Sequence, residues 1–202
     1  MLQQGRTFSF DANRTTRLAN AFASGLASSG VVPTMKHFPG IGLATRNTDL
    51  FVDVIRASKA KLRPDLRPYR EAIDGDIPMI MLSNATYPAY DRRNGAGWSR
   101  AIAIRLLRRD LGFTGVSITD SLNGTANARG TSVRRLAILA ARAGTDMILV
   151  TSKERSSEWL YGQLLNKAKR GKIPLATLQA SYDRILALKS RLSGDTPTLE
   201  SS

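Results

Sequence analysis

The sequence predicts an α/β protein with a parallel sheet, and two observations carry this prediction. Short apolar segments of strand length alternate along the chain with longer segments of helical periodicity. One short segment, residues 77–82, is continuously apolar, which is typical of a parallel strand covered on both faces. Lys36 and His37 end one such segment and Asp120 ends another, and ligands bind where the strands of a parallel sheet end.

The first half of the chain starts with a predicted helix that is capped by Asp11 or Asn13 and stopped by Gly30. The strand after it ends in Lys36 and in the only histidine of the chain, His37. The next elements are a loop at 38–62, a helix at 64–74, the strand at 77–82, a turn-rich loop at 88–98 and a helix at 99–111. A loop as long as the first of these is usually functional or disordered, and its place after the Lys-His pair favours function.

The helix at 99–111 is predicted to have one buried and one solvated face, because apolar and basic residues alternate in it at helical spacing. Ser99 is its expected cap. The residues predicted to point inward are Ile102, Leu106 and Leu107, and those predicted to point outward are Arg105, Arg108 and Arg109.

The second half of the chain contains the strand at 116–119, which ends at Asp120. After it come a glycine-rich loop at 123–130, a helix capped by Thr131 or Ser132, a strand at 146–150, and helices at 154–169 and 175–191. The polar tail, residues 193–202, is expected to be frayed. The order is a helix followed by about four strand–helix units, which indicates a parallel sheet.

Composition excludes several classes of protein. The 202 residues are 42% hydrophobic, enough for a single core, and the absence of cysteine excludes disulfides and thiolate metal sites. No apolar run approaches the roughly 20 residues of a membrane helix. The first residues lack the apolar core of a secretion signal, so a cytoplasmic location is expected.

The formal net charge of +14 raises the question of nucleic-acid binding. The arginines are dispersed along the chain and fall mostly on expected solvent faces of helices. No aromatic residues interleave with them as a stacking platform for bases requires. The pattern therefore predicts no specific nucleic-acid site.

Four ordered segments resemble glycoside hydrolase family 3, in its β-N-acetylhexosaminidase branch. The Met-Lys-His-Phe-Pro-Gly-Ile-Gly segment at 35–42 resembles the family signature, and residues 111–120 resemble the segment that carries its nucleophilic aspartate. Residues 143–150 resemble its last barrel strand, and Arg6 begins a segment similar to its Arg-Ser-Tyr/Phe motif. The resemblance extends from about Arg6 to about Leu192.

The resemblance implies a (β/α)₈ TIM-barrel type of fold, of which this chain supplies the carboxyl-terminal half. A complete barrel needs eight strands and about 250 residues. Residues 1–192 are therefore expected to form a partial barrel domain, and residues 193–202 a disordered tail. The chain is a fragment, is completed by a separate chain, or folds as an open half-barrel. Because a half-barrel exposes sheet edges, self-association or pairing with a complementary barrel half is expected.

The resemblance also implies a catalytic and sugar-binding site. Asp120 matches the nucleophile, and Lys36, His37 and Arg6 match residues that hold the sugar. Asn84, at the end of the strand at 77–82, either supplies a further hydrogen bond to the sugar or closes the turn after the strand. The mechanism requires no metal and no organic cofactor.

The proton donor is where the chain departs from the family. Asn47-Thr48-Asp49 stands where the resembled branch has Asp-x-His, so Asp49 replaces the histidine. A second histidine of the signature is replaced by Ile41. A carboxylic acid can act as general acid if burial raises its pKa, so Asp49 is the candidate acid/base, with an ordinary loop aspartate as the alternative.

Three functions are consistent with these features. The first is a retaining glycoside hydrolase that releases a terminal sugar such as β-linked N-acetylglucosamine or glucose. The second is a truncated or degenerate relative that binds sugar without turnover. The third is a basic, non-enzymatic domain that binds anionic polymers.

Overall fold

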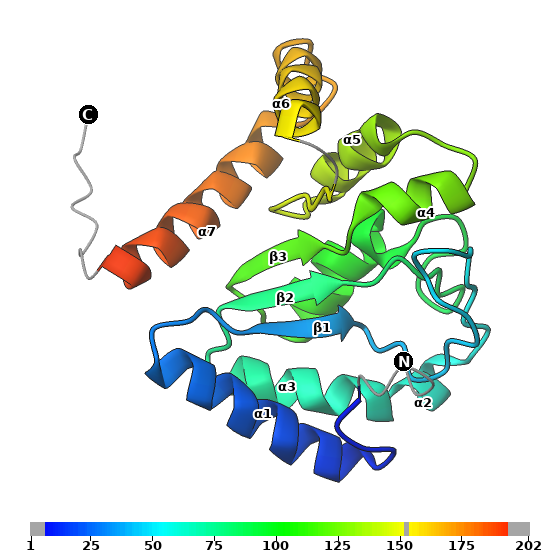
Figure 1. The fold of residues 1–202 in the computed structure, drawn as a ribbon, viewed down its shortest axis with the longest axis vertical. Coiled ribbons are helices and arrows are strands. Elements are labelled where there is room, and N and C mark those ends of the chain that lie inside the picture. The colour runs from blue at the N-terminus through cyan, green and yellow to red at the C-terminus, as the bar shows by residue number, and fades with distance from the viewer. Residues whose placement is uncertain (1–6, 152–153, 194–202) are drawn as a thin grey trace.

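The computed structural model describes residues 7–151 and 154–193. At its centre lies a parallel sheet in the order β1-β2-β3, made of β1 (Thr34–Phe38), β2 (Met79–Leu82) and β3 (Val116–Thr119) (Figure 1). Thr34 is paired with Met79, and Met79 with Val116. The predicted parallel α/β architecture is confirmed, and the three strands end on the same side of the molecule.

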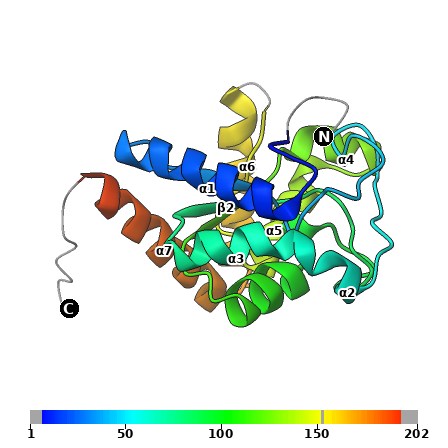
Figure 2. The same cartoon turned by 90° about the horizontal axis from the view of Figure 1, so that it is seen from below.

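Helices cover the sheet on both sides. On one side α1 (Ala12–Ser28) lies against α3 (Arg67–Asp74), as both views of the ribbon show (Figures 1 and 2). Asp11 is the cap of α1, and its carboxylate accepts the Arg14 N–H at 2.7 Å. Besides η4 and α4, which are described below, the other helical elements are α2 (Lys59–Leu62), η2 (Pro64–Leu66), η3 (Ala96–Trp98), α5 (Val133–Ala143), α6 (Glu154–Lys169) and α7 (Leu175–Ser193). The predicted frayed tail falls on residues outside the described part of the chain, apart from Ser193, which ends α7.

Two apolar cores result from this arrangement. One is built around the sheet and includes Phe38, Ile80 and Leu82. The other joins Trp98 and Leu122 to α5. Both cores reach the edge where the strands end, because Phe38 and Leu82 close their strands and Leu122 follows shortly after β3.

The prediction of a strand at 146–150 is wrong, because these residues, which the structure describes, form no regular strand. The segment runs beside β3 but is joined to it by a single parallel bridge, Ile118 to Met147. Side chains replace part of the regular ladder, because the Asp146 carboxylate accepts the Ser117 N–H and the Thr119 hydroxyl accepts the Leu149 N–H. A ladder of backbone bonds cannot form where side chains occupy its donors.

The predicted glycine-rich loop at 123–130 is also wrong, because residues 122–128 form helix α4 (Leu122–Ala128). Leu122, Thr125 and Ala126 are buried at helical spacing, so packing against the second core outweighs the low helix propensity of Gly124. The nucleophile candidate Asp120 therefore stands directly before a helix rather than before a loop.

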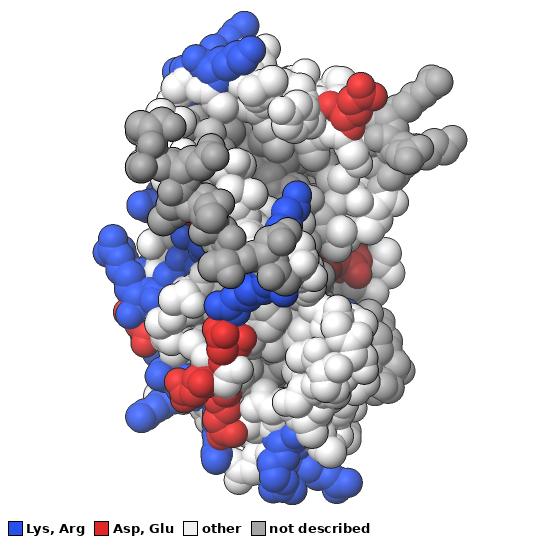
Figure 3. All heavy atoms as spheres, turned by 90° about the vertical axis from the view of Figure 1, so that its left-hand side faces the viewer, with Lys and Arg blue, Asp and Glu red and all other residues white. Residues whose placement is uncertain are grey.

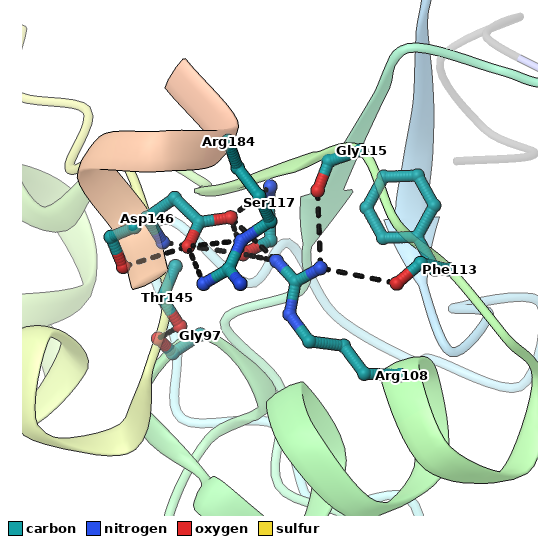
Figure 4. Close-up of polar contacts among 9 residues, drawn as sticks. Gly97, Arg108, Phe113, Gly115, Ser117, Thr145, Asp146 and Arg184 are labelled. Atoms are coloured by element: carbon teal, nitrogen blue, oxygen red, sulfur yellow. Dashed lines mark hydrogen bonds and ion pairs between the residues drawn. The ribbon is translucent and has the colours of Figure 1, made fainter. Parts of the chain in front are cut away.

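The helix predicted at 99–111 is observed as η4 (Ala101–Asp110), which has π-type turns. Ile102, Leu106 and Leu107 are buried as predicted, but the outward placement of Arg108 is wrong. Its guanidinium turns inward and donates to the fully buried Asp146 carboxylate at 2.5 Å (Figure 4). A guanidinium on an apolar face is stable only with such a partner, and the partner lies 38 residues away in sequence.

The basic residues do not form one continuous stripe on the face seen in Figure 3. Lys and Arg side chains lie there in separate groups, with acidic side chains near some of them. No helix within the described ranges combines the length and the apolarity needed to cross a bilayer.

Candidate active site

Three of the residues expected in the site lie at or just beyond the carboxyl ends of β1 and β3. Lys36 is exposed near the end of β1, and the next residue, His37, is buried. The His37 Nε2 atom lies 3.5 Å from Asp120 Oδ2, with the two side chains 5% and 14% exposed. The strand ends thus bring together an imidazole and a carboxylate that are far apart in sequence.

Both carboxylate oxygens of Asp120 have defined neighbours. Oδ2 faces His37, and Oδ1 accepts the Ser121 N–H at 2.8 Å. The Asp120 N–H donates to the Leu82 carbonyl at 3.0 Å, which continues the pairing of β3 with β2. The contacts of the two oxygens fix the direction of the carboxylate, as a nucleophile requires.

Asn84, which follows β2, is buried and contacts the residue next to Asp120. Its side chain is 1% exposed, and its Nδ2 donates to the Ser121 carbonyl at 3.0 Å. Asn84 therefore contacts the residue that follows Asp120, and its amide N–H is engaged inside the protein.

The loop after β1 is fastened at its base by a residue that the sequence analysis did not single out. The buried Asp53 carboxylate accepts the N–H groups of Thr45 and Arg46 at 2.9 and 3.3 Å. The Asp53 carbonyl accepts the Thr86 N–H, and the Thr86 carbonyl accepts the Ile55 N–H, at 3.0 and 2.9 Å. The loop is thus closed on itself and attached to the segment that leaves β2. In the sequence, the only sign of a role for Asp53 was its position in the loop that follows the Lys-His pair.

Asp49 lies in this loop, next to α4. Its N–H donates to Asn47 Oδ1 at 2.9 Å, and its backbone contacts Gly124 so closely that a Cβ on Gly124 would lie 2.4 Å from the Asp49 carbonyl oxygen. Gly124 is only four residues after Asp120, so the structure brings the loop with Asp49 to the helix that follows the nucleophile candidate. Arg6, the remaining predicted site residue, lies outside the described residues.

This contact makes Gly124→Ala a direct test of the loop position. Replacing a helical glycine by alanine normally stabilises by about 0.5–1 kcal/mol. At Gly124 we expect the opposite, a loss of about 1–3 kcal/mol, because the new methyl group overlaps a backbone carbonyl. Urea unfolding measures the change, and hydrogen exchange should increase in residues 45–53.

Gly25→Ala is the matched control, since Gly25 lies within α1 and a Cβ there meets nothing within 4 Å. This variant should be as stable as the parent or more stable. Equal stabilisation by both substitutions would show that the Asp49 loop does not rest on α4.

Tyr87 and Asp65 contact the Pro39-Gly40 turn, and neither was predicted as a site residue. The Tyr87 hydroxyl donates to the Gly40 carbonyl at 2.9 Å, and burial is the main cause that raises the pKa of Tyr87, so the phenol keeps its proton at neutral pH. Gly40 has φ +120°, and a Cβ there would lie 2.6 Å from Asp65 Cβ, so only glycine fits. These contacts hold the turn that directly follows the strand end with Lys36 and His37.

Comparison with known proteins identifies the family of this chain. Residues 3–188 match the family described as "Glycosyl hydrolase family 3 N terminal domain". The chain belongs to glycosyl hydrolase family 3. Among the described residues of this family 3 chain, no three His, Asp or Glu side chains gather as a metal site would require.

The curated relatives are longer than this family 3 chain. An "Uncharacterized secreted glycosyl hydrolase" of Arthroderma benhamiae is 38% identical over 194 residues, which cover 94% of this chain and 55% of that protein. A "Beta-hexosaminidase" of Nitrosomonas eutropha is 33% identical over 160 residues, which cover 79% of this chain and 46% of that protein. The chain thus spans about half the length of these relatives.

Solved structures confirm the fold class. A family 3 β-N-acetylglucosaminidase from Paenibacillus sp. superposes with a TM-score of 0.89 at 29% identity, covering 98% of this chain and 38% of that one. A β-N-acetylhexosaminidase from Beutenbergia cavernae superposes with a TM-score of 0.85 at 34% identity, covering 92% of this chain and 55% of that one. The chain has the fold of part of a family 3 (β/α)₈ barrel, as predicted.

Proposed function

We propose that this chain carries the two catalytic carboxylates of a retaining glycosidase, an enzyme that releases a terminal sugar such as β-linked N-acetylglucosamine or glucose. The observation that carries the proposal is the Asp120 carboxylate at the end of β3, with one oxygen on a backbone N–H and the other facing His37. The β-hexosaminidase and β-N-acetylglucosaminidase names of the relatives support the choice of sugar.

The proposed first step is attack by Asp120 on the anomeric carbon of the sugar. A bond forms between an Asp120 oxygen and this carbon while the bond to the departing oxygen breaks, and the departing oxygen takes a proton from an acid. Lys36 is exposed at the strand end and can donate to sugar hydroxyls. We propose that His37 also contacts the sugar and that it orients Asp120. Arg6 and Asn84 remain predicted sugar-binding residues.

Asp49 is the proposed acid and, in the second step, the base that deprotonates water. Its support is the close approach of its backbone to Gly124 in α4 and the attachment of its loop at Asp53. Retaining glycosidases hold their two carboxyl groups about 5–5.5 Å apart, so the proposal requires this separation between Asp49 and Asp120 when sugar is bound.

Asp49→Ala should slow substrates according to their leaving groups. The β-linked disaccharide of N-acetylglucosamine needs a proton on its departing oxygen, so we expect its turnover to fall about 10²–10⁴-fold. The p-nitrophenyl glycoside needs no such proton, so its first step should change little. Azide should partly restore turnover of the aryl glycoside, because it attacks the glycosyl-enzyme without help from a base.

Asp74→Ala is the control, since Asp74 ends α3 on the far side of the sheet from α4. Both substrates should react with it as with the parent chain. Equal slowing of both substrates by Asp49→Ala, without azide rescue, would leave Asp49 an ordinary loop residue.

The alternatives differ in simple observations. Sugar binding without turnover of the aryl glycoside would favour the degenerate relative, and salt-dependent binding of anionic polymers without competition by sugar would favour the basic domain. Association with a second copy or a complementary barrel half stays a prediction. So does the cytoplasmic location, and one relative is described as secreted.

A further inference from the structure

Arg129 stands at the end of α4, and its guanidinium contacts the segment that leaves β2. One of its terminal nitrogens donates to the Asn84 carbonyl and to Thr86 Oγ1, both at 3.0 Å. The guanidinium carbon lies 4.9 Å from the centre of the buried Trp98 ring. None of the ion pairs found among the described residues includes Arg129. The Arg129 guanidinium is thus partly buried, and its contacts are with uncharged groups. Burial lowers its pKa.

Asn84 contacts both ends of α4. Its side-chain amide donates to the Ser121 carbonyl just before the helix, and its backbone carbonyl accepts from Arg129 just after the helix. Because Ser121 follows Asp120 and donates its own N–H to that carboxylate, a shift of α4 would turn the carboxylate. Arg129 and Asn84 together therefore fix the helix that carries the nucleophile candidate at its start.

The second partner of Arg129 is Thr86, which is connected to the loop that carries Asp49. Its backbone pairs with Asp53 and Ile55, at the base of the loop that carries Asp49. The same guanidinium nitrogen thus contacts two residues of the segment that leaves β2. One is Asn84, which donates to Ser121, and the other is Thr86, which pairs with the base of the Asp49 loop. The packing leaves little freedom here, since a Cβ on Gly95 would lie 2.6 Å from the Trp98 ring and 2.7 Å from the Asn84 carbonyl oxygen.

We infer that Arg129 is a positioning residue of the active site, which sets the separation of Asp120 and Asp49 by joining α4 to Asn84 and Thr86. The inference rests on the proposed function, because it concerns the two carboxylates of that reaction. A neutral side chain of similar length fills the same space but cannot donate to either oxygen, so it should loosen both connections at once.

The test compares Arg129→Met and Arg129→Ala with the parent chain, using the p-nitrophenyl glycoside of N-acetylglucosamine. We expect kcat to fall about 10²-fold in Arg129→Met, since misplacement of a catalytic group by about 1 Å has an effect of this size. KM should change much less, because Arg129 contacts no sugar in the proposed site. Arg129→Lys keeps the charge and a single donor nitrogen, so its kcat should lie between those of the parent chain and Arg129→Met.

Chemical rescue separates positioning from general damage to the fold. Arg129→Ala leaves a space beside Trp98 that free guanidinium can occupy, so millimolar guanidinium chloride should raise its kcat and leave the parent chain unchanged. Arg105→Ala is the matched control, since Arg105 is exposed on η4, and it should keep the parent kcat with and without guanidinium.

Hydrogen exchange supplies a readout that does not need turnover. In Arg129→Met, exchange should increase in residues 45–55 and 121–128 together and stay unchanged in α1. An unchanged kcat in Arg129→Met, or unchanged exchange in both segments, would overturn the inference about Arg129. The proposed function itself fails on a different result, namely turnover by the parent chain that Asp120→Asn does not reduce.

Discussion

Asp120→Asn should abolish turnover of glycosides, with kcat reduced by several powers of ten. The amide keeps the shape of the carboxylate but cannot attack the anomeric carbon, so no glycosyl-enzyme forms. The assay is release of p-nitrophenol from the aryl glycoside, combined with mass spectrometry of the chain after reaction with an activated 2-fluoro glycoside. The parent chain should gain the mass of one fluorosugar at Asp120, and the variant should gain none.

Asp183→Asn is the control for this experiment, because Asp183 is exposed on α7, where it accepts a hydrogen bond from Gln179. It should react and become labelled as the parent does. Labelling at a residue other than Asp120, or a parent-like rate in Asp120→Asn, would reject the assignment of the nucleophile.

Asp146→Asn should have the largest effect on stability. The buried carboxylate accepts on Oδ2 from Arg108 and from both donors of Ser117, and on Oδ1 from Ser181 and Arg184, at 2.5–3.1 Å (Figure 4). These contacts join β3, η4 and α7. Burial lowers the pKa of Arg108 to about 10, which leaves it charged at neutral pH.

The asparagine variant would leave two partly buried guanidinium groups facing each other without a counter-charge. Removing one partner of a buried ion pair costs about 3–5 kcal/mol. Domains of this size are stable by only about 5–15 kcal/mol, so a loss of this size is a substantial part of the total, and urea unfolding should show a clearly lower midpoint.

The surface pair of Asp76 and Arg191 provides the comparison. Its atoms lie 2.9 Å apart, but the two side chains are 70% and 57% exposed. Asp76→Asn should cost less than about 1 kcal/mol, because water and salt screen an exposed pair. Similar losses in the two variants would show that the Asp146 cluster does not carry stability through its buried charge.

The helices were predictable where a cap and an apolar face coincide. Asp11 caps α1 and Ser132 caps α5, each through a side-chain oxygen that accepts a backbone N–H three residues later. The helices at Glu154–Lys169 and from Leu175 also match their predicted positions. These signals are local, so they can be recognised without knowing what the helix packs against.

The candidate site was predictable where a motif ends a strand. Lys36, His37 and Asp120 close apolar segments and lie in motifs that resemble those of the family, and the parallel sheet brings His37 to Asp120. Asp53 and Arg129 were not found in this way. Asp53 accepts from a backbone N–H of a turn, and Arg129 donates to a backbone carbonyl of a distant segment. Such partners leave no pattern in the sequence around either residue.

The sequence by itself determined the alternation of helices and strands, the strand ends that carry Lys36, His37 and Asp120, and the membership of family 3. Only the tertiary structure decided that Arg108 turns inward to Asp146 and that the segment around Gly124 is a helix. The physical reason is the same for both. Whether a charge can be buried, or a poor helix former can be helical, depends on the free energy of contacts with distant parts of the chain.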